Sequence, residues 1–473
     1  MRSESPAYRA DPVADGVIAE VLGPCAPSPL ALNATDWIHA CADQWAHITQ
    51  VNRCIATWTQ NADLQDWQPP AGVEPHVAVA LQRYLATGLQ LPDWADPVRI
   101  HRAEEIFMDY GALSCVLLFC SSLPECYVVP DLASVLHETG QLEKRTEYRI
   151  RSTAAMIFPV MMHGGLTLGA GGGVAQVLKV RLIHAMVRHL ILHDSPEAAL
   201  ASPAHGNVAP LDAKPQDMYQ ALFARGWVAD DNGLPCNQQE LAYTLLTFGY
   251  VFLRSMRRLG IGLTPHDEEA YLHAWNVVGH VLGIERSLMA ETMTEAETLF
   301  TRMQLEGCAR SLTPDPRPPL AQALMNTMKD AIPWRLASAF PVLMTGYLCG
   351  RKTMKALGLT GPVALASWAA FVLLMWLIRG FDWLVRLVVP TFSVSRFLSR
   401  VVGYQLLTKI LMDQTRPLKL PDALLTQVGG VVDGWGTDPK APKWLNTLED
   451  RFTKPGGWAP SAAPSVAPAD QTV

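Results

Sequence analysis

The spacing of apolar and polar positions along the chain is helical almost throughout. Apolar residues recur every three or four positions, which is the spacing of one helix face. They do so in five central stretches: 103–120 (AEEIFMDYGALSCVLLFC), 146–163 (TEYRIRSTAAMIFPVMMH), 179–192 (KVRLIHAMVRHLIL), 238–260 (QQELAYTLLTFGYVFLRSMRRLG) and 266–284 (HDEEAYLHAWNVVGHVLGI). We expect the first stretch to form one helix that ends before Ser121. Almost no segment alternates with the period of two that strands require. The sequence therefore predicts an all-α fold.

Breaks in this pattern predict four regions along the chain. Residues 1–95 are expected to form an N-terminal arm, loose at its beginning, and a helical extension. Residues 96–345 hold the main helical core, which contains a glycine cluster for close turning between packed helices and a long polar loop. Residues 346–420 form apolar C-terminal helices, and residues 421–473 a tail whose Pro- and Ala-rich end is expected to be disordered.

An uncharged run over residues 356–378 stands out in the C-terminal part. Such a run is long enough to cross a bilayer, although a buried core helix has the same composition. The aromatic and basic residues that follow it, Trp383 among them, favour a membrane interface. Asp382 argues against a second full crossing, because a central carboxylate is costly in lipid. We therefore expect residues 356–389 to associate with a membrane surface, with Trp376 and Trp383 near the headgroups.

Composition narrows the function classes and the compartment. Charged residues make up 17% of the chain, against about 25% in ordinary soluble proteins, which suits apolar ligands or a membrane surface. The net charge of −6 argues against a nucleic-acid partner. The nine cysteines contain no CxxC pair and are expected to be reduced thiols. The first residues, MRSESPAYRADPVADG, lack the apolar core of an export signal, which predicts an intracellular protein, either cytoplasmic or on the inner membrane.

The stretch 179–192 carries the sharpest group of residues that could perform chemistry. On a helix Arg181, His184 and Arg188 share one face among apolar neighbours, where they are costly to bury without partners. A haem is one economical partner, since a neutral imidazole ligates iron and guanidinium groups pair with propionates. A structural histidine beside arginine–carboxylate pairs is the default alternative, which these residues alone leave open.

Two weaker groups lie on other predicted helices. Arg149 and Thr153, four residues apart, could orient a cofactor or bind dioxygen, or could instead form a helix-start ion pair. His273 and His280 lie about two turns apart, roughly 10 Å of rise, so we do not expect them to bind one metal together. We expect each of these histidines to have a structural role of its own.

Taken together and in this order, the segments resemble the latex-clearing-protein (rubber oxygenase) and mpaB-type haem oxygenase family. The resemblance rests on residues 103–128, 149–161, 179–192, 233–284 and, more weakly, 319–333. It implies a globin-like helical core, with additional N- and C-terminal helices, that holds a non-covalent haem b. It also implies that His184 is the proximal ligand of the iron. Pocket residues would then be Arg149 and Thr153, with Arg181, Arg188 and His189 around the ligand, and His273 and His280 on the later helix.

One position departs from the rubber-cleaving members of that family. Those members have a lysine directly before the threonine, and here the residue is Ser152, which predicts a more open iron unless another residue such as His163 takes its place. Glu138, in LHETGQL, is the candidate general base. The expected function is a haem b-dependent oxygenase that acts with O₂ on an apolar substrate, with an unsaturated or isoprenoid-like chain as the candidate. The alternatives are a haem- or lipid-binding protein without catalysis and a membrane-associated scaffold without a cofactor, and the oligomeric state stays open.

Overall fold

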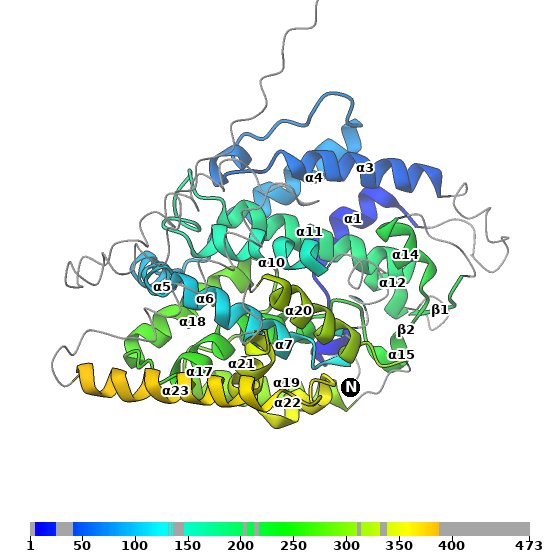
Figure 1. Ribbon diagram of the computed structural model, residues 1–473. Helices are drawn as coiled ribbons and strands as arrows, with labels where there is room; N and C mark the ends of the chain where they lie inside the picture. Colours follow the sequence, from blue (N-terminus) through cyan, green and yellow to red (C-terminus); the bar gives the residue numbers. More distant parts are fainter. Residues whose placement is uncertain are drawn as a thin grey trace, which may run out of the picture.

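The computed structural model describes residues 5–24, 41–130, 132–133, 135, 146–201, 206–211, 217–309, 314–331 and 338–386. Helices and short turns make up nearly all of this part of the chain (Figure 1). In order they are η2 (Pro6–Tyr8), α1 (Pro12–Leu22), α3 (Ala42–Ala56), η4 (Asn61–Leu64), α4 (Pro75–Gly88), α5 (Pro97–Asp109), α6 (Gly111–Leu117), η5 (Leu118–Ser122), α7 (Leu123–Cys126), α10 (Thr146–Met161), α11 (Gly173–Leu192), α12 (Pro196–Ala201), β1 (Asn207–Val208), α14 (Met218–Ala224), β2 (Trp227–Val228), α15 (Ala229–Asn232), α16 (Gln238–Phe248), α17 (Tyr250–Arg258), α18 (Pro265–Val281), η6 (Arg286–Leu288), α19 (Met293–Cys308), α20 (Arg317–Ala331), α21 (Phe340–Cys349), α22 (Arg351–Ala356) and α23 (Leu365–Arg386). The predicted all-α class is confirmed.

Helix α11 is the central element of the core. It packs against α10, α1, α14 and α18, and its apolar side chains Leu178, Leu182 and Met186 are fully buried. In Figure 1 the N-terminal helices α1, α3 and α4 lie above α11, while α18, α17 and the C-terminal helices lie below it. The helix that carries the predicted haem ligand is therefore surrounded by protein along most of its length.

The predicted polar loop over residues 193–237 contains short elements that the sequence did not indicate. In the part that the structure describes, these are α12, α14 and α15, and the strands β1 and β2 pair antiparallel with Asn207 opposite Val228. Each element is only two to seven residues long, too short for a periodic apolar pattern to mark it.

The expectation of one continuous helix over residues 103–120 is wrong. The chain breaks at Tyr110, where α5 ends and α6 begins, and the two segments meet at 90°. Gly111 follows the break and favours it, because glycine is a poor helix former. Beyond the break the helical structure does not end before Ser121. It continues through the π-helical turn η5 into α7.

The expectation of a loose N-terminal arm is also wrong for residues 5–24. Helix α1 begins with an N-cap by Asp11, whose side chain accepts a hydrogen bond from the backbone N–H of Ala14. Val17 and Ile18 are buried against the core. Asp11 and Asp15 are buried as well, because arginines on α11 compensate their charge.

The glycine cluster between α10 and α11 turns the chain as predicted. A Cβ atom on Gly165 would lie 2.1 Å from the carbonyl oxygen of Pro159, and one on Gly171 would lie 2.2 Å from that of Gly164. Side chains at these positions would force the backbone apart. The close turn brings the end of α10 back against the start of α11, which sets the relative position of the helices that carry Thr153 and His184.

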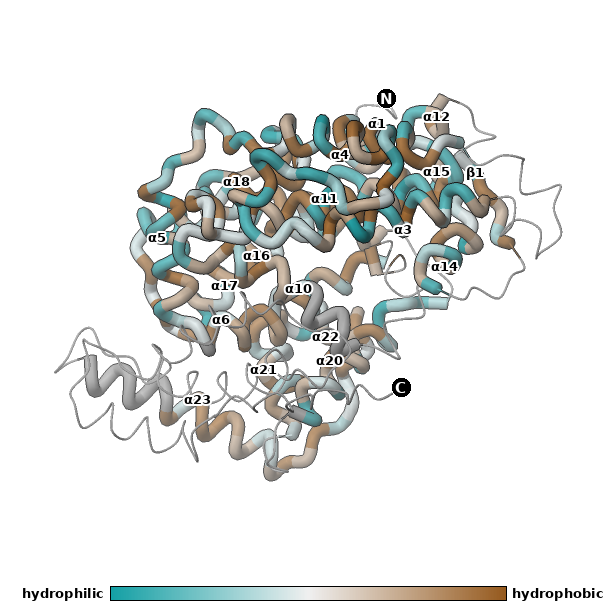
Figure 2. The backbone as a smooth tube through the Cα atoms, turned by 90° about the horizontal axis from the view of Figure 1, so that it is seen from above, coloured by the Kyte–Doolittle hydropathy of each residue, from teal (hydrophilic) through white to brown (hydrophobic). Residues whose placement is uncertain are grey.

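The apolar run over residues 356–378 is divided between two helices. It begins at the end of α22, passes through a turn and continues in α23. Within the described part of the chain, no single helix is both long and apolar enough to span a membrane. Helix α23 lies at the periphery in both views (Figures 1 and 2), and Leu365, Trp368, Leu373 and Trp376 on it are at least half exposed. The side chains of Asp382 and Trp383, on which the interface prediction drew, lie outside the described residues.

Candidate functional site

An apolar cavity of about 310 Å³ lies between α7, α10, α11, α16 and α18. Its size falls at the lower end of the range for small-molecule and cofactor sites. Most of its lining is aliphatic or aromatic: Leu123, Tyr127, Leu132, Val135, Met156, Val180, Ile183, Leu241, Leu245, Phe248, Trp275, Val278 and Leu282. The few polar or sulfur-bearing lining residues are Cys126, Thr153, His184, Cys236, Glu240 and Thr244. A pocket of this kind selects an apolar ligand and orients it through a small number of polar contacts.

His184 and Thr153 come from different helices and line the same cavity. His184 lies on α11 and Thr153 on α10, and each side chain is partly accessible from the cavity rather than sealed in the core. The sequence placed these residues in two separate groups with separate arguments, and the fold brings them together. The helical spacing explains the arrangement, since Val180, Ile183 and His184 face one side of α11 together.

Glu240 is a cavity residue that sequence reasoning missed. It lies in the first turn of α16 and its side chain is buried, with 7% of the residue exposed. Its backbone N–H donates to the side-chain oxygen of Asn237, the N-cap residue, at 3.0 Å. This Asn-x-x-Glu spacing is a helix-start signal, so the sequence could have placed Glu240 in the first turn of a helix. The spacing does not indicate that the side chain of Glu240 lines a cavity.

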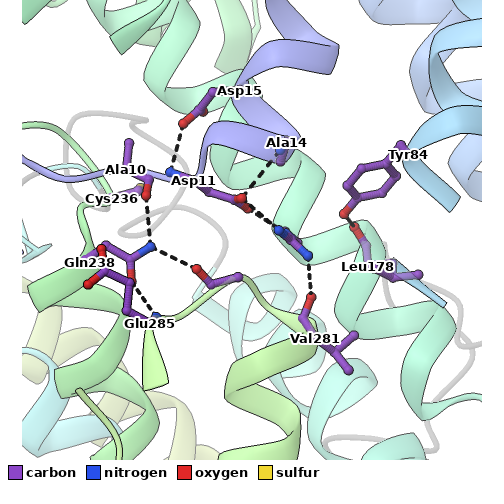
Figure 3. A network of polar contacts seen from close by, with 12 residues as sticks. Ala10, Asp11, Ala14, Asp15, Tyr84, Leu178, Cys236, Gln238, Val281 and Glu285 are labelled. Carbon is purple, nitrogen blue, oxygen red and sulfur yellow. Dashed lines mark hydrogen bonds and ion pairs between the residues drawn. The ribbon is translucent and has the colours of Figure 1, made fainter. Parts of the chain in front are cut away.

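Arg181 and Arg188 point away from the cavity toward α1. Arg181 forms a two-pronged ion pair with Asp11, with Nε–Oδ2 at 2.5 Å and Nη2–Oδ1 at 2.7 Å (Figure 3). Arg188 is fully buried, and its Nε donates to Asp15 Oδ1 at 2.7 Å while its Nη1 donates to the carbonyl oxygen of Cys236 at 2.8 Å. Neither arginine is among the described residues that line the cavity, and both already have a carboxylate partner. The structure thus supplies the arginine–carboxylate pairs that the default alternative required, and the haem-propionate role of Arg181 and Arg188 stays a prediction.

The same polar network holds α16 in place beside the cavity. Gln238, two residues before Glu240, donates from Nε2 to the carbonyl oxygens of Ala10 and Gly283 at 2.9 and 2.8 Å. Its Oε1 accepts from the backbone N–H of Glu285 at 2.9 Å (Figure 3). One amide side chain therefore ties the N-terminal segment, the start of α16 and the end of α18 together.

The remaining histidines of the predicted site do not line the cavity. Burial lowers the pKa of His189 to about 4, and its Nε2 lies 2.9 Å from the carbonyl oxygen of Gly23. His273 accepts a hydrogen bond from the backbone N–H of Asp96 at 2.9 Å, and burial lowers its pKa to about 4. The ring of Trp94 lies between His273 and His280, 5.7 and 5.9 Å from their centroids. The expectation that these two histidines act separately is consistent with this arrangement.

Three predicted positions lie outside what the structure describes. Glu138 is not among the described residues, and the side chains of Arg149 and Ser152 are not described, although both residues belong to α10. Their predicted roles stay predictions. His163, considered as a distal ligand, lies beyond the end of α10 next to Glu104 and is not among the described cavity residues.

The described lining fits the ring and the iron of a haem b, and it contains no cationic side chain for the propionates. A porphyrin is a flat apolar ring that needs apolar walls, and its iron needs one axial donor from the protein such as the nitrogen of a neutral imidazole. The cavity offers His184 as its sole imidazole among the described lining residues, with a hydroxyl and a carboxylate as further polar groups. His184 would hold the iron, and Val180 and Ile183 on the same helix would contact the ring.

Comparisons with known proteins concern the fold and the family of the chain. The rubber oxygenase of Streptomyces sp. (strain K30) is 24% identical over 254 residues, which cover 53% of this chain and 52% of that protein. The match thus spans about half the length of that relative. The structure of latex clearing protein LCP in the closed state superposes with a TM-score of 0.55 at 17% identity and covers 91% of both chains, a likeness of fold. Residues 98–380, more than half of the chain, match the family described as ER-bound oxygenase mpaB/B′/rubber oxygenase, catalytic domain, and the chain belongs to this family.

Proposed function

We propose that the protein is a haem b-dependent oxygenase that acts with O₂ on an apolar, unsaturated substrate of isoprenoid type. The observation that carries the proposal is the meeting of His184 and Thr153 in one apolar cavity, together with family membership. Haem b, when bound, supplies the iron at which dioxygen is activated.

In this proposal the chain's own residues perform binding, orientation and proton transfer. His184 on α11 would hold the iron, and the Thr153 hydroxyl on α10 would orient a polar atom of the substrate. The aliphatic and aromatic walls bind an apolar chain and exclude water. Glu240, which lines the cavity, would accept a proton from a substrate carbon and return it as the two carbonyl groups form, and Glu138 is a second candidate for that role.

The electron balance of the reaction separates cleavage from hydroxylation. Cleavage of a carbon–carbon double bond by one O₂ gives two carbonyl groups, takes up both oxygen atoms and needs no external electrons. Hydroxylation places one oxygen atom in the product and the other in water, and therefore needs two electrons from a reductant.

The test is turnover of a short unsaturated isoprenoid chain by the haem-loaded protein under ¹⁸O₂, with and without a reductant. We expect products with ¹⁸O-labelled carbonyl groups and no requirement for the reductant. Strict dependence on the reductant with one labelled hydroxyl would replace cleavage with hydroxylation. Bound haem without turnover of any unsaturated chain would favour the alternative of a haem- or lipid-binding protein without catalysis.

We also propose that α23 rests on a membrane surface and that the protein is intracellular. Trp368 and Trp376 lie two turns apart on one apolar face, and tryptophan is favoured at membrane interfaces. Burial of a large apolar side chain contributes roughly 1.5–3 kcal/mol, so partial insertion of this face would suffice to hold the protein. Flotation with liposomes should carry the wild type and lose the Trp368→Ser/Trp376→Ser variant. Equal recovery of both in the lipid-free fraction would remove the membrane proposal.

A further inference from the structure

A compact group of two histidines and one glutamate lies outside the cavity, where α5 meets the loop after α10. His101 and Glu104 are one turn apart on α5, and His163 follows the end of α10. Nδ1 of His101 lies 3.5 Å from Glu104 Oε2, and Nδ1 of His163 lies 3.9 Å from the same oxygen. One ligand atom from each of the three residues can be chosen so that all lie within 4.8 Å of one another.

Glu104 is more deeply buried than a carboxylate in a surface ion pair normally is. Only 2% of the residue is exposed, although both histidines beside it face solvent. Its Oε2 accepts a hydrogen bond from the backbone N–H of Gly164 at 2.9 Å. Gly164 has a φ of +70° and belongs to the glycine turn between α10 and α11. No hydrogen-bond donor among the described residues reaches its buried Oε1. The oxygen that faces both histidines is Oε2, so within the described part of the chain the buried carboxylate has one hydrogen bond in all for its two oxygens. Such a group is costly unless a cation compensates its charge.

We propose that His101, Glu104 and His163 form a binding site for a divalent transition-metal ion of the zinc type. Two imidazoles and one carboxylate are a donor set that Zn²⁺ accepts at about 2.0–2.2 Å per ligand, which separates tetrahedral ligands by about 3.4 Å. The two histidine–glutamate separations are 3.5 and 3.9 Å, and the histidine nitrogens lie within 4.8 Å of each other, so rotation of the two exposed histidine side chains can bring the three ligand atoms to that value. The two exposed histidines leave the remaining coordination positions open to water. The ion would join α5 to the glycine turn that positions α10 against α11.

A second cluster in the molecule serves as an internal comparison. His47, Glu74 and His76 also bring their ligand atoms within 4.8 Å, but Glu74 has half of its side chain exposed. One oxygen of Glu74 already accepts from Gln50 Nε2 at 2.7 Å. This carboxylate is solvated and hydrogen-bonded without a metal, so we infer no site there.

The test is Zn²⁺ binding by the full-length, haem-loaded protein after dialysis against a chelator, measured by competition with a chromophoric chelator and by thermal unfolding. We expect one Zn²⁺ per chain and a rise in the unfolding midpoint with Zn²⁺ concentration. Because loss of an outer-shell partner alone lowers metal affinity by about 10- to 100-fold, His163→Ala should weaken binding by about 100-fold or more. His163 is 74% exposed, so this variant keeps the fold. Glu104→Gln should weaken binding to a similar extent.

Two control variants keep the proposal falsifiable. His266→Ala removes an exposed histidine on α18 that belongs to neither cluster, and His76→Ala disrupts the comparison cluster. Both should bind Zn²⁺ as the wild type does. The proposal is overturned if the wild type binds no Zn²⁺, if His163→Ala binds it with unchanged affinity, or if His76→Ala abolishes the tightest binding.

Discussion

Replacement of Arg188 with methionine separates a structural role of this arginine from a role in cofactor binding. The Arg188 side chain is fully buried and pairs with Asp15, itself buried, at 2.7 Å. Removal of one partner leaves the other charge buried without compensation, which costs about 3–5 kcal/mol of unfolding free energy. Arg188→Met should therefore lower the free energy of unfolding by that amount in guanidinium titrations, with haem occupancy of the remaining folded protein unchanged.

Helix α1, which carries Asp15, also offers a matched control pair at the surface. Glu20 of α1 pairs with Arg83 of α4 at the surface, where both side chains are about half exposed. Exposed pairs contribute about 0–1 kcal/mol, so Arg83→Ala should change stability by no more than that. The double variant Asp15→Leu/Arg188→Met should recover much of the loss, because an apolar pair of similar volume replaces a buried ion pair at little cost. An Arg188→Met protein that is as stable as Arg83→Ala but deficient in haem would refute the structural role of Arg188 and support its predicted role as a partner of a haem propionate.

Three further predictions concern the histidines and the cavity. Burial holds the pKa of His189 at about 4, below its unfolded value of about 6.5, so the unfolded state binds more protons. The free energy of unfolding should therefore fall by up to about 3 kcal/mol from pH 6.5 to pH 4. A plot of this free energy against pH should have a shallower slope for His189→Gln, and an unchanged slope would contradict the assignment. Thr153→Ala should keep the fold and the haem but alter the spectrum of ligand-bound protein, and an identical spectrum with identical activity would remove Thr153 from the pocket's chemistry. Because Ser152 is too short to ligate iron as a lysine does, cyanide and imidazole should bind readily and shift the Soret band, whereas a six-coordinate, nitrogen-ligated spectrum that resists both would point to another distal residue.

The helices of the core were predictable because their apolar spacing is local information. The stretches 146–163, 179–192 and 266–284 correspond closely to α10, α11 and α18. The break at Tyr110 could not be predicted from the apolar pattern, which continues across it, and Gly111 was a local signal for the break that the pattern outweighed. Among the short elements within 193–237, α12, α14 and β1 pack against α11, a contact that their own sequence pattern does not indicate.

The candidate site was predictable in its residue types and less so in its contacts. His184 stood out as an imidazole on an apolar helix, and the fold places it at the cavity. The burial of Asp11 and Asp15 depends on a contact between residues far apart in the chain, so the ion pairs of Arg181 and Arg188 could not be read from spacing. The direction of Glu240 into the cavity likewise depends on how α16 is held against its neighbours.

The central claim is that haem b is bound through His184, and the visible spectrum of purified protein tests it most directly. The wild type, reconstituted with haem and then passed over a desalting column, should show a Soret band with one haem per chain, as isolated and after reduction. His184→Ala should lose stoichiometric haem while its far-ultraviolet circular dichroism stays close to that of the wild type. A wild type without a Soret band, or a His184→Ala variant with full haem occupancy and the same spectrum, would contradict the account.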